Sequence, residues 1–466
     1  MRQVRISRAQ RTSLVGGAML LAALVAASLA VQGSRAAGVS APTARANVEA
    51  RVARSDLPGR LEAALGSEFG GVWYEPTGAA LHVGIASPEA RQEAEAVAAQ
   101  AGLADDVALT SVDSTSAQLN TAQRRWDQRL SGLFARGAVT TSVAPDSNAV
   151  VVELASSVPG SVRTALAREA ATDPVEVQIQ RLPDSHLGAQ PFARCAALAA
   201  KFKAYCNPTL VSGVSIDDEK EVEQKGDCTA GPLAIRHEPP SEAASTETFL
   251  LTAGHCLTGE GAVGKKWFAF EKGGKAGERK KIGVASAALI TELKVGVDVG
   301  VIPLEAEPWK TAANPPLKPV IASWNAGKES EPFPVIKQVA PVKEAKTCFS
   351  GQRSGTQCGK ITATGKTIPI MGIVEGKEVQ IGEWVQAYEV ALTTGKGGQG
   401  DSGSPFFSEA PFKEKSEGDV EGILVGGFGE ESETVIAQPL SFLLEKLKAL
   451  KGLDYELLTT ANEKRM

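Results

Sequence analysis

Apolar and polar residues follow three different patterns along the 466-residue chain. Residues 14–31 form an uncharged run rich in Leu, Ala and Val. Between about residues 47 and 185, short apolar runs typical of strands are interleaved with helical patterns, which predicts an α+β unit. From about residue 206 onward, short apolar runs are separated by turns that contain Gly and Pro, a pattern typical of β-sandwiches and β-barrels.

The predicted α+β unit carries local start and stop signals for helices. Ser87, Pro88 and Glu89 suit a first turn, because Ser caps it, Pro fits the first position and Glu faces the positive end of the helix dipole. Gly137 is placed to end a second helix. The pattern predicts strands over 72–74, 79–86, 148–154 and 175–179, and helices over 87–100, 116–136 and 162–171.

The C-terminal part is expected to form one or two closed barrels of short strands. The predicted strands include 249–251, 295–302, 379–381, 384–390 and 422–427. The strongest helical pattern lies near the C-terminus, where leucines recur at helical spacing: Leu440, Leu443, Leu444, Leu447 and Leu450. We expect this helix to pack on the last barrel.

Composition excludes several classes of protein. Hydrophobic residues make up 43% and charged residues 22%, which is not typical of a disordered chain or of one embedded in a membrane throughout. The net charge of −5 has the wrong sign for a nucleic-acid binder. The first 200 residues contain no lysine, whereas lysine is frequent from Lys201 onward. The chain therefore consists of two unlike pieces that meet near residue 200.

The N-terminus has the pattern of a secretory signal. Four arginines precede the apolar run, and small residues follow it. We expect residues 1–37 to be a signal peptide and the protein to be secreted. An uncleaved anchor is the alternative, because the 18 residues of this run are just enough to span a bilayer. Export places the six cysteines in an oxidising compartment, where disulfides persist.

Three short segments carry residues suited to nucleophilic catalysis. They are Thr252–Cys256 (TAGHC), Val297–Ile302 (VDVGVI) and Gly400–Pro405 (GDSGSP). A serine hydroxyl needs a base, and histidine can take its proton near neutral pH. A buried aspartate then orients the imidazole and stabilises its cation. Glycines around Ser402 let the backbone turn sharply, so that the N–H groups of Gly400 and Ser402 can face one oxygen as an oxyanion hole.

Asp298 is the only aspartate between His255 and Asp401. It lies in an apolar run that we expect to be a strand, where a carboxylate is costly to bury without a partner. Pairing with His255 supplies such a partner, so His255, Asp298 and Ser402 are the candidate catalytic residues. The alternative for Asp298 is a surface position on an edge strand.

The segments TAGHC, DVGVI and GDSGSP, in this order, resemble those of chymotrypsin-fold serine proteases, and more closely of the secreted bacterial streptogrisin and alpha-lytic protease group. The resemblance implies a mainly β fold, with two packed antiparallel β-barrels and a C-terminal helix, preceded by an α+β pro-domain. Gly70–Trp73 and residues 81–86 and 147–154 resemble strands of that group's pro-region, which assists folding and inhibits the protease until it is cut. We therefore expect a pro-region over 38–190 and a protease domain over 191–466, with cleavage between about 181 and 215.

The same resemblance implies three disulfides and a substrate-binding strand. The implied disulfides are Cys195–Cys206, Cys228–Cys256 and Cys348–Cys358. The implied substrate-binding residues are Val425, Gly426 and Gly427.

The chain departs from the family's pattern near the nucleophile. The cysteine that usually precedes the nucleophile motif is missing, and with it a bridge that braces the specificity pocket. Phe349 stands where relatives carry a basic residue that pairs with the aspartate before the nucleophile, so Asp401 needs another partner, and Arg353 is the nearest candidate. Val425 replaces a serine whose hydroxyl supports the catalytic aspartate, and Ser404 replaces a glycine.

The three catalytic segments and the resemblance to this protease group together predict a secreted serine endopeptidase that is made as a self-processed zymogen. Its expected partners are protein or peptide substrates and its own pro-region as an intramolecular inhibitor. We expect no cofactor, no metal site, no nucleic-acid binding, no membrane binding apart from the signal segment, and a monomeric state. A catalytically inactive homologue that serves as a secreted binding protein is the alternative. An esterase is disfavoured, because GDSG lacks the Gly-x-Ser-x-Gly pattern and the chain order of that class.

Overall fold

The computed structural model describes most of the chain from Ala41 onward. The described residues are 41–183, 186, 189–191, 210–218, 228–236, 247–257, 264–270, 279–285, 287–288, 296–305, 317–325, 328–374, 377–408, 418–429 and 431–462. The expected signal segment, Cys195 and Cys206 lie outside the described residues. The chain divides into two compact units after Ser40, and every element below belongs to the second, Ala41–Met466.

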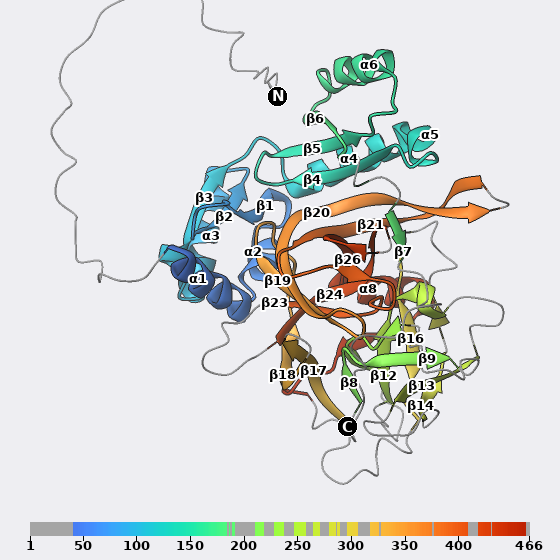
Figure 1. Ribbon diagram of the computed structural model, residues 1–466. Coiled ribbons are helices and arrows are strands. Elements are labelled where there is room, and N and C mark those ends of the chain that lie inside the picture. The colour runs from blue at the N-terminus through green and yellow to red at the C-terminus, as the bar shows by residue number, and fades with distance from the viewer. Residues whose placement is uncertain are drawn as a thin grey trace, which may run out of the picture. The chain divides into compact units, whose positions relative to one another are not determined.

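The first part of this unit is an α+β region, which we term the N-terminal region and define as residues 41–181 (Figure 1). Its helices are α1 (Ala41–Ser55), α2 (Leu57–Leu65), α3 (Pro88–Gln100), α4 (Ser116–Arg129), α5 (Ser131–Phe134) and α6 (Gly160–Ala170). Its strands are β1 (Phe69–Tyr74), β2 (Leu81–Ile85), β3 (Val107–Ser111), β4 (Val139–Ala144), β5 (Ala149–Leu154) and β6 (Glu176–Arg181). The structure adds α1, α2, β3 and β4 to the predicted elements and divides the predicted helix over 116–136 in two.

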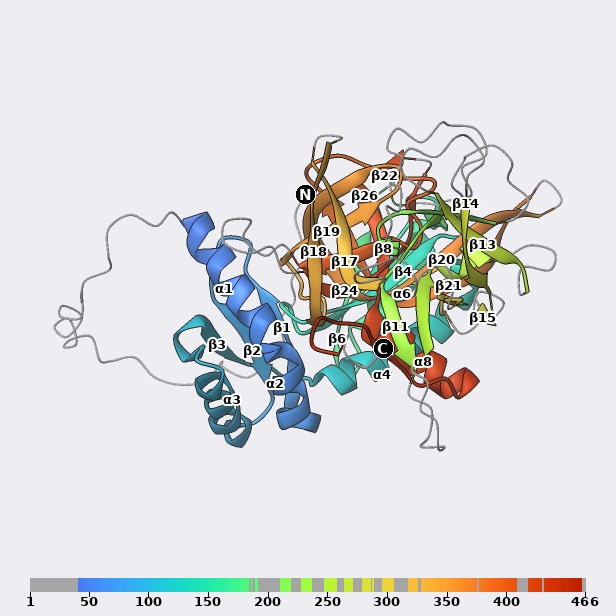
Figure 2. The same cartoon turned by 90° about the horizontal axis from the view of Figure 1, so that it is seen from below.

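Two groups of paired strands organise the N-terminal region. The first has the order β1–β2–β3, and Figure 2 shows α1, α2 and α3 beside it. Strands β4, β5 and β6 are neighbours in that order, and their apolar side chains pack with those of α4, α5 and α6. Local signals act as predicted at α3, where the Ser87 hydroxyl accepts the Ala90 N–H at 3.3 Å. Thr115 and Gln118 cap each other's backbone at the start of α4.

The described residues from Leu210 to Asn462 form a β-rich part with two halves. The first half consists of two sheets, one of which includes β27 from the end of the chain. Their strand orders are β10–β9–β13–β14 and β15–β16–β12–β11–β27. The strands are β9 (Ser215–Asp218), β10 (Cys228–Thr229), β11 (Leu233–Arg236), β12 (Glu247–Thr252), β13 (Lys266–Phe270), β14 (Arg279–Val284), β15 (Ala287–Ala288), β16 (Gly300–Pro303) and β27 (Tyr455–Leu457). Leu250 of β12 packs into the core of this half, whereas Phe249 and Leu251 face a second core. The apolar run Phe249–Leu251 suits the centre of β12, because alternate residues of a strand point to opposite faces and both faces are buried here.

The second half contains a closed barrel. Strands β19, β20, β21, β26, β24 and β23 pair in that order, and β23 pairs back with β19, so the ring has no free edge. The elements of this half are β17 (Leu317–Asn325), β18 (Lys328–Gln338), β19 (Lys346–Gly351), β20 (Gly355–Val374), β21 (Lys377–Leu392), β22 (Gly397–Gly398), β23 (Pro405–Ser408), β24 (Gly418–Phe428), β25 (Glu431–Ser432), β26 (Thr434–Pro439) and α8 (Leu440–Lys451); β8 (Leu210–Ser212) joins it by pairing with β17. Phe349, Tyr388 and Phe406 are fully buried in its core.

The C-terminal helix α8 forms where the leucine spacing predicts it. Leu440, Leu443 and Leu447 are buried against the β-rich part, and Gly452 ends the helix with a φ of 67°. The predicted fold class is therefore confirmed: the chain is mainly β, with a C-terminal helix and a preceding α+β region.

The N-terminal region and the barrel share a sheet. Strand β4 pairs antiparallel with β20, with Val143 opposite Thr364 and Thr141 opposite Thr367 (Figure 1). Between these two pairs, Lys366 of β20 is 3% exposed, and its Nζ lies 2.9 Å from the carboxylates of both Glu153 and Glu389. Burial lowers the pKa of Lys366, but the two carboxylates outweigh burial and raise that pKa above its ordinary value. Lys366 is therefore a buried cation that joins the two parts of the fold.

Replacing Lys366 with Met is expected to destabilise the chain by about 3–5 kcal/mol, because it removes the Lys366 cation from the buried Glu389 carboxylate and from the half-buried Glu153 carboxylate. Urea unfolding of the full-length chain that carries Ser402→Ala measures the change in the free energy of unfolding. Lys343→Met is the matched control, since the Lys343–Asp146 pair also joins the two parts but its side chains are 19% and 37% exposed. That control is expected to cost about 1 kcal/mol or less. Equal losses in the two variants would contradict the assigned role of Lys366.

The predicted strand over 295–302 is wrong in its first half. Residue 295 lies outside the described residues, and the strand β16 begins only at Gly300. Asp298 precedes that strand in a buried segment whose backbone bonds to a side chain, because its N–H donates to Gln438 Oε1 at 2.9 Å. The alternative of a surface position for Asp298 is excluded, since the residue is fully buried.

Candidate active site

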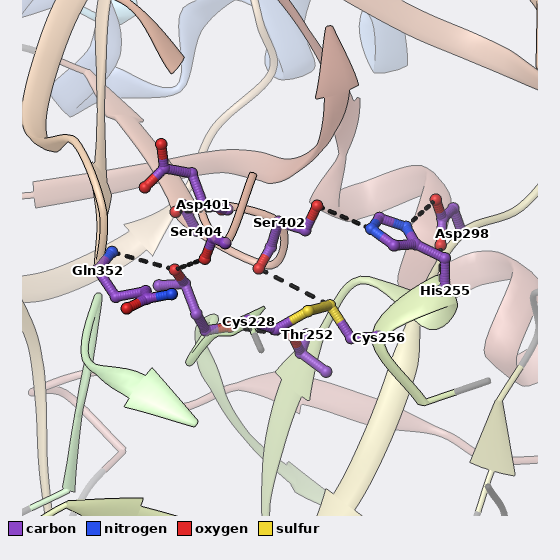
Figure 3. The surroundings of a disulfide bond; sticks show 11 residues. Cys228, Thr252, His255, Cys256, Asp298, Gln352, Asp401, Ser402 and Ser404 are labelled. Carbon is purple, nitrogen blue, oxygen red and sulfur yellow. Dashed lines mark hydrogen bonds and ion pairs between the residues drawn. A yellow bond between two sulfur atoms is a disulfide. The ribbon is translucent and has the colours of Figure 1, made fainter. Parts of the chain in front are cut away.

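The three sequence segments converge on one cluster of side chains. His255 lies between Ser402 and Asp298 (Figure 3). Its Nε2 is 2.7 Å from Ser402 Oγ, and its Nδ1 is 2.8 Å from Asp298 Oδ2. His255 belongs to a short 3₁₀ turn after β12, Asp298 precedes β16, and Ser402 precedes β23. The side chains thus have the contacts of a nucleophile, a base and a carboxylate that orients the base.

Asp298 is held as an ionised carboxylate. Its Oδ1 accepts the backbone N–H of His255 at 2.8 Å, and its Oδ2 faces the imidazole. Burial raises the pKa of Asp298, but the charge and hydrogen bonds of His255 outweigh burial and leave that pKa below its ordinary value. An ionised carboxylate here fixes the ring so that Nδ1 carries a proton and Nε2 can accept one from Ser402.

The loop that carries Ser402 is fastened to both halves of the β-rich part. The Ser402 carbonyl accepts the Thr229 N–H at 2.8 Å, and the Gly400 carbonyl accepts the Thr229 hydroxyl at 2.8 Å. On the other side, the Gly403 N–H donates to the Leu424 carbonyl at 2.9 Å. Gly403 has a φ of 91°, and a Cβ there would collide with the Thr229 carbonyl, so only glycine fits. The loop geometry is therefore fixed by tertiary contacts.

Asp401 is satisfied without a basic side chain. Its Oδ1 accepts the backbone N–H groups of Arg353 and Ser354, both at 3.0 Å. Its Oδ2 accepts the Ser354 hydroxyl at 2.5 Å and the Gly398 N–H at 3.0 Å. Burial raises the pKa of Asp401, and these hydrogen bonds oppose that rise.

The Arg353 side chain does not pair with Asp401, which corrects the expectation from sequence. Its guanidinium donates to the Gln399 carbonyl at 3.2 Å and to the Glu431 carboxylate at 2.9 Å. Glu431 lies opposite Gly398 in the β22–β25 pair. Arg353 therefore joins two segments near the Ser402 loop, one at Gln399 and the other at β25. Ser404 donates its hydroxyl to the Asp401 carbonyl at 2.5 Å.

Two disulfides are present among the described residues, and both join cysteines that the resemblance pairs. Cys228–Cys256 lies beside the loop that carries Ser402, with Cys256 Sγ 3.8 Å from the Ser402 carbonyl oxygen (Figure 3). Cys348–Cys358 joins the paired strands β19 and β20. The expected Cys195–Cys206 bridge falls outside the described residues.

The segment Val425–Gly427 lies directly after Leu424, whose carbonyl accepts the Gly403 N–H of the loop that carries Ser402. Strand β7 (Ala189–Pro191) pairs antiparallel with this stretch, with Pro191 opposite Gly426 and Gln190 opposite Gly427. A segment from the junction of the two pieces thus takes the position of an added strand on β24.

No family model matches the chain, and no curated protein matches it either. Solved structures similar to it are bacterial serine proteases. Nocardiopsis protease is 19% identical and covers 54% of this chain and 100% of its own, with a TM-score of 0.34. Thermobifida fusca protease A is 17% identical, with coverages of 54% and 99% and a TM-score of 0.33. Cellulomonas bogoriensis chymotrypsin is 18% identical, with coverages of 54% and 100% and a TM-score of 0.33. The rest of this chain has no counterpart in them.

The site contains residues that the sequence analysis did not single out. Trp384 Nε1 donates to Asp298 Oδ2 at 3.0 Å, and Gln438 accepts the Asp298 N–H. Neither residue belongs to a recognisable motif. Their signal is tertiary, because both come from barrel strands far along the chain from Asp298.

The described residues contain no group of three or more His, Cys, Asp or Glu side chains that could hold a metal ion. Among the helices in the described part of the chain, none is long and apolar enough to cross a membrane.

Proposed function

We propose that the chain is a secreted serine endopeptidase that is made as a zymogen and cuts itself. The observation that carries the proposal is the contact of His255 with both Ser402 Oγ, at 2.7 Å, and Asp298 Oδ2, at 2.8 Å. A serine hydroxyl bonded to an imidazole, which is bonded in turn to a buried carboxylate, has the geometry needed to form an acyl-enzyme.

In the proposed reaction, Ser402 Oγ attacks the carbonyl carbon of a peptide bond while His255 Nε2 takes the hydroxyl proton. His255 then gives this proton to the leaving amine, and the amine departs from the acyl-enzyme. Water attacks the ester by the same route in reverse and releases the new carboxyl terminus. Asp298 stays ionised throughout and stabilises the imidazolium.

The N–H groups of Gly400 and Ser402 are proposed to bind the oxyanion of the tetrahedral intermediate. The Gly400 N–H shares its peptide plane with the Gln399 carbonyl, which accepts the Arg353 guanidinium at 3.2 Å. The Ser402 N–H shares its peptide plane with the Asp401 carbonyl, which accepts the Ser404 N–H at 3.0 Å. Gly400 has a φ of 96°, a conformation that L side chains rarely adopt. Donors held in place before the reaction lower the barrier because they need no reorganisation as charge develops.

Val425, Gly426 and Gly427 are proposed to bind the substrate backbone. Extended peptides bind exposed strands by adding main-chain hydrogen bonds, and β7 pairs with β24 in that manner. Because β7 lies within the expected cleavage range of 181–215, it supports a pro-region that blocks the cleft until it is cut. The shared β4–β20 sheet supports the same role for residues 38–190.

An active-site phosphonate tests the proposed function. The secreted protein is incubated with the probe, and its peptides are mapped by mass spectrometry. An adduct on Ser402, together with hydrolysis of peptide substrates, is the expected result. N-terminal sequencing of the active form is expected to give a start between about 181 and 215. A folded, processed protein that forms no adduct would contradict the proposal and favour an inactive homologue with a binding role.

A further inference from the structure

A buried tryptophan contacts the Asp298 carboxylate. Trp384 lies in β21, is fully buried, and donates its indole N–H to Asp298 Oδ2 at 3.0 Å. The same oxygen faces His255 Nδ1 at 2.8 Å. Asp298 Oδ2 therefore has two donors, while Oδ1 accepts the His255 backbone N–H.

The strand that carries Trp384 is locked to the segment that carries Asp298. Gln438 accepts the Asp298 N–H at 2.9 Å and donates to the carbonyls of Gly296, at 2.6 Å, and Val385, at 2.8 Å. The Val385 N–H also donates to the Gly296 carbonyl at 3.1 Å. These bonds leave the indole little freedom to move relative to the carboxylate.

Gly296 allows this close approach. Its φ is 75°, and a Cβ at this position would meet the Val385 side chain at 2.6 Å. Glycine is thus needed for both the backbone conformation and the space beside β21. The contact between the Asp298 segment and the Trp384 strand is built into the fold at several residues.

The indole compensates for a hydroxyl that this chain lacks. Val425 stands where the resembling family carries a serine that supports the catalytic aspartate, and a valine side chain has no donor. Val425 and Trp384 belong to the same buried apolar cluster. A fully buried carboxylate needs its oxygens satisfied, and the Trp384 hydrogen bond is one of the interactions that lower the pKa of Asp298 against the effect of burial.

We propose that Trp384 is a positioning residue of the catalytic machinery, acting on Asp298 and through it on His255. This inference rests on the proposed function. The indole N–H holds Oδ2 in the plane where it meets His255 Nδ1, and it helps to keep Asp298 ionised while His255 accepts the Ser402 proton. Trp384 thus supplies to the triad, from β21, the donor that Val425 cannot.

Trp384→Phe tests the proposal, because it keeps an aromatic ring and removes the N–H. We expect kcat to fall about 10- to 100-fold, as for loss of a hydrogen bond to a charged group. KM is expected to stay within about twofold, since Trp384 is placed against Asp298 and not against substrate. The acid limb of the kcat/KM profile is expected to move to higher pH, because a carboxylate with one donor fewer stabilises the protonated imidazole more strongly.

Trp267→Phe is the matched control. Trp267 of β13 is also fully buried, and its Nε1 has no hydrogen-bond partner in the described part of the chain. The same substitution there removes an N–H that orients nothing, so kcat and the acid limb are expected to stay at wild-type values. If Trp384→Phe does not fold, benzothienylalanine at 384 replaces the N–H with sulfur at nearly constant shape, and the same losses are expected.

Two outcomes overturn the proposal while the wild-type enzyme is active. One is an unchanged kcat and acid limb in the position-384 variants. The other is a loss of kcat that is equal at positions 384 and 267 with the acid limb in place, which marks a structural effect. Failure of the proposed function is a separate result: the wild-type protein then forms no phosphonate adduct on Ser402 and cuts no peptide, and the inference falls with it.

Discussion

Changing Ser402 to Ala is expected to lower kcat about a million-fold and to leave the chain uncut between about residues 181 and 215. The reason is chemical: the alanine side chain offers His255 Nε2 no proton and the peptide carbonyl no nucleophile. Because the cut is proposed to be made by the chain itself, the same change removes both activity and maturation. The residual rate comes from binding and the oxyanion donors alone.

The measurement compares secreted protein from the two genes by gel, N-terminal sequencing and peptide hydrolysis. Ser350→Ala is the matched control, since Ser350 is also fully buried but donates its hydroxyl to the Ala322 carbonyl, away from His255. It is expected to mature and to keep its activity. Normal processing of Ser402→Ala would show that another protease makes the cut, and normal peptide hydrolysis would show that Ser402 is not the nucleophile.

Raising the pH from about 5 to about 8 is expected to destabilise the uncut chain through Glu421 of β24. This carboxyl is buried and accepts the Thr347 hydroxyl at 2.5 Å. Burial raises the pKa of Glu421 to about 8, the Thr347 bond opposes the rise, and the charges of Asp419 and Glu49 add to it. A cavity beside Glu421 is lined by both parts of the fold, including Glu49, Asp56, Tyr74, Lys346, Asp419 and Glu421.

The direction follows from the two protonation equilibria. In the unfolded chain a glutamate ionises near its ordinary pKa of 4.5, whereas folded Glu421 keeps its proton until about pH 8. The stabilisation from this proton is fully present below about pH 4.5 and is lost as the pH rises through 8. Between these values the free energy of unfolding falls by about 1.4 kcal/mol per pH unit on account of this one group.

Urea unfolding of the inactive Ser402→Ala chain between pH 5 and 9 measures this dependence. Adding Glu421→Gln removes the ionisation while keeping a neutral side chain of the same shape, so the fall with pH is expected to flatten. Glu62→Gln changes an exposed glutamate of α2 and is expected to leave the slope as it is. Parallel stability curves with and without Glu421 would contradict the prediction.

The residues of the candidate site could be identified from the sequence where their chemistry depends on their immediate neighbours in the chain. TAGHC and GDSGSP each place a reactive residue among small neighbours that the backbone needs for a turn, and Asp298 is the only aspartate between His255 and Asp401. The α3 start at Ser87 and the α8 leucines were predictable for the same reason, because capping and helical spacing act over a few residues.

Other expectations were wrong where a backbone or side-chain group forms a hydrogen bond with a residue far away in the sequence. The apolar run before Gly300 is not all strand, because the Asp298 N–H donates to Gln438, 140 residues away, instead of to a neighbouring strand. Arg353 serves Asp401 with its N–H, while its guanidinium is drawn to Glu431. Strand β4, which the sequence analysis did not identify, pairs along its whole length with the neighbouring β5 and at two positions with the distant β20.

The side chains suited to the chemistry, their order along the chain and the mainly β class could all be read from the sequence, since they depend on residue type and on spacing over a few positions. The residues that hold His255, Asp298 and Ser402 in place became evident only from the folded chain. Trp384 reaches Asp298 across 86 residues of chain, and Thr229 fastens the Ser402 loop from 173 residues before it. A buried carboxylate takes whichever donors the packing of strands brings to it, and that packing is a property of the whole barrel.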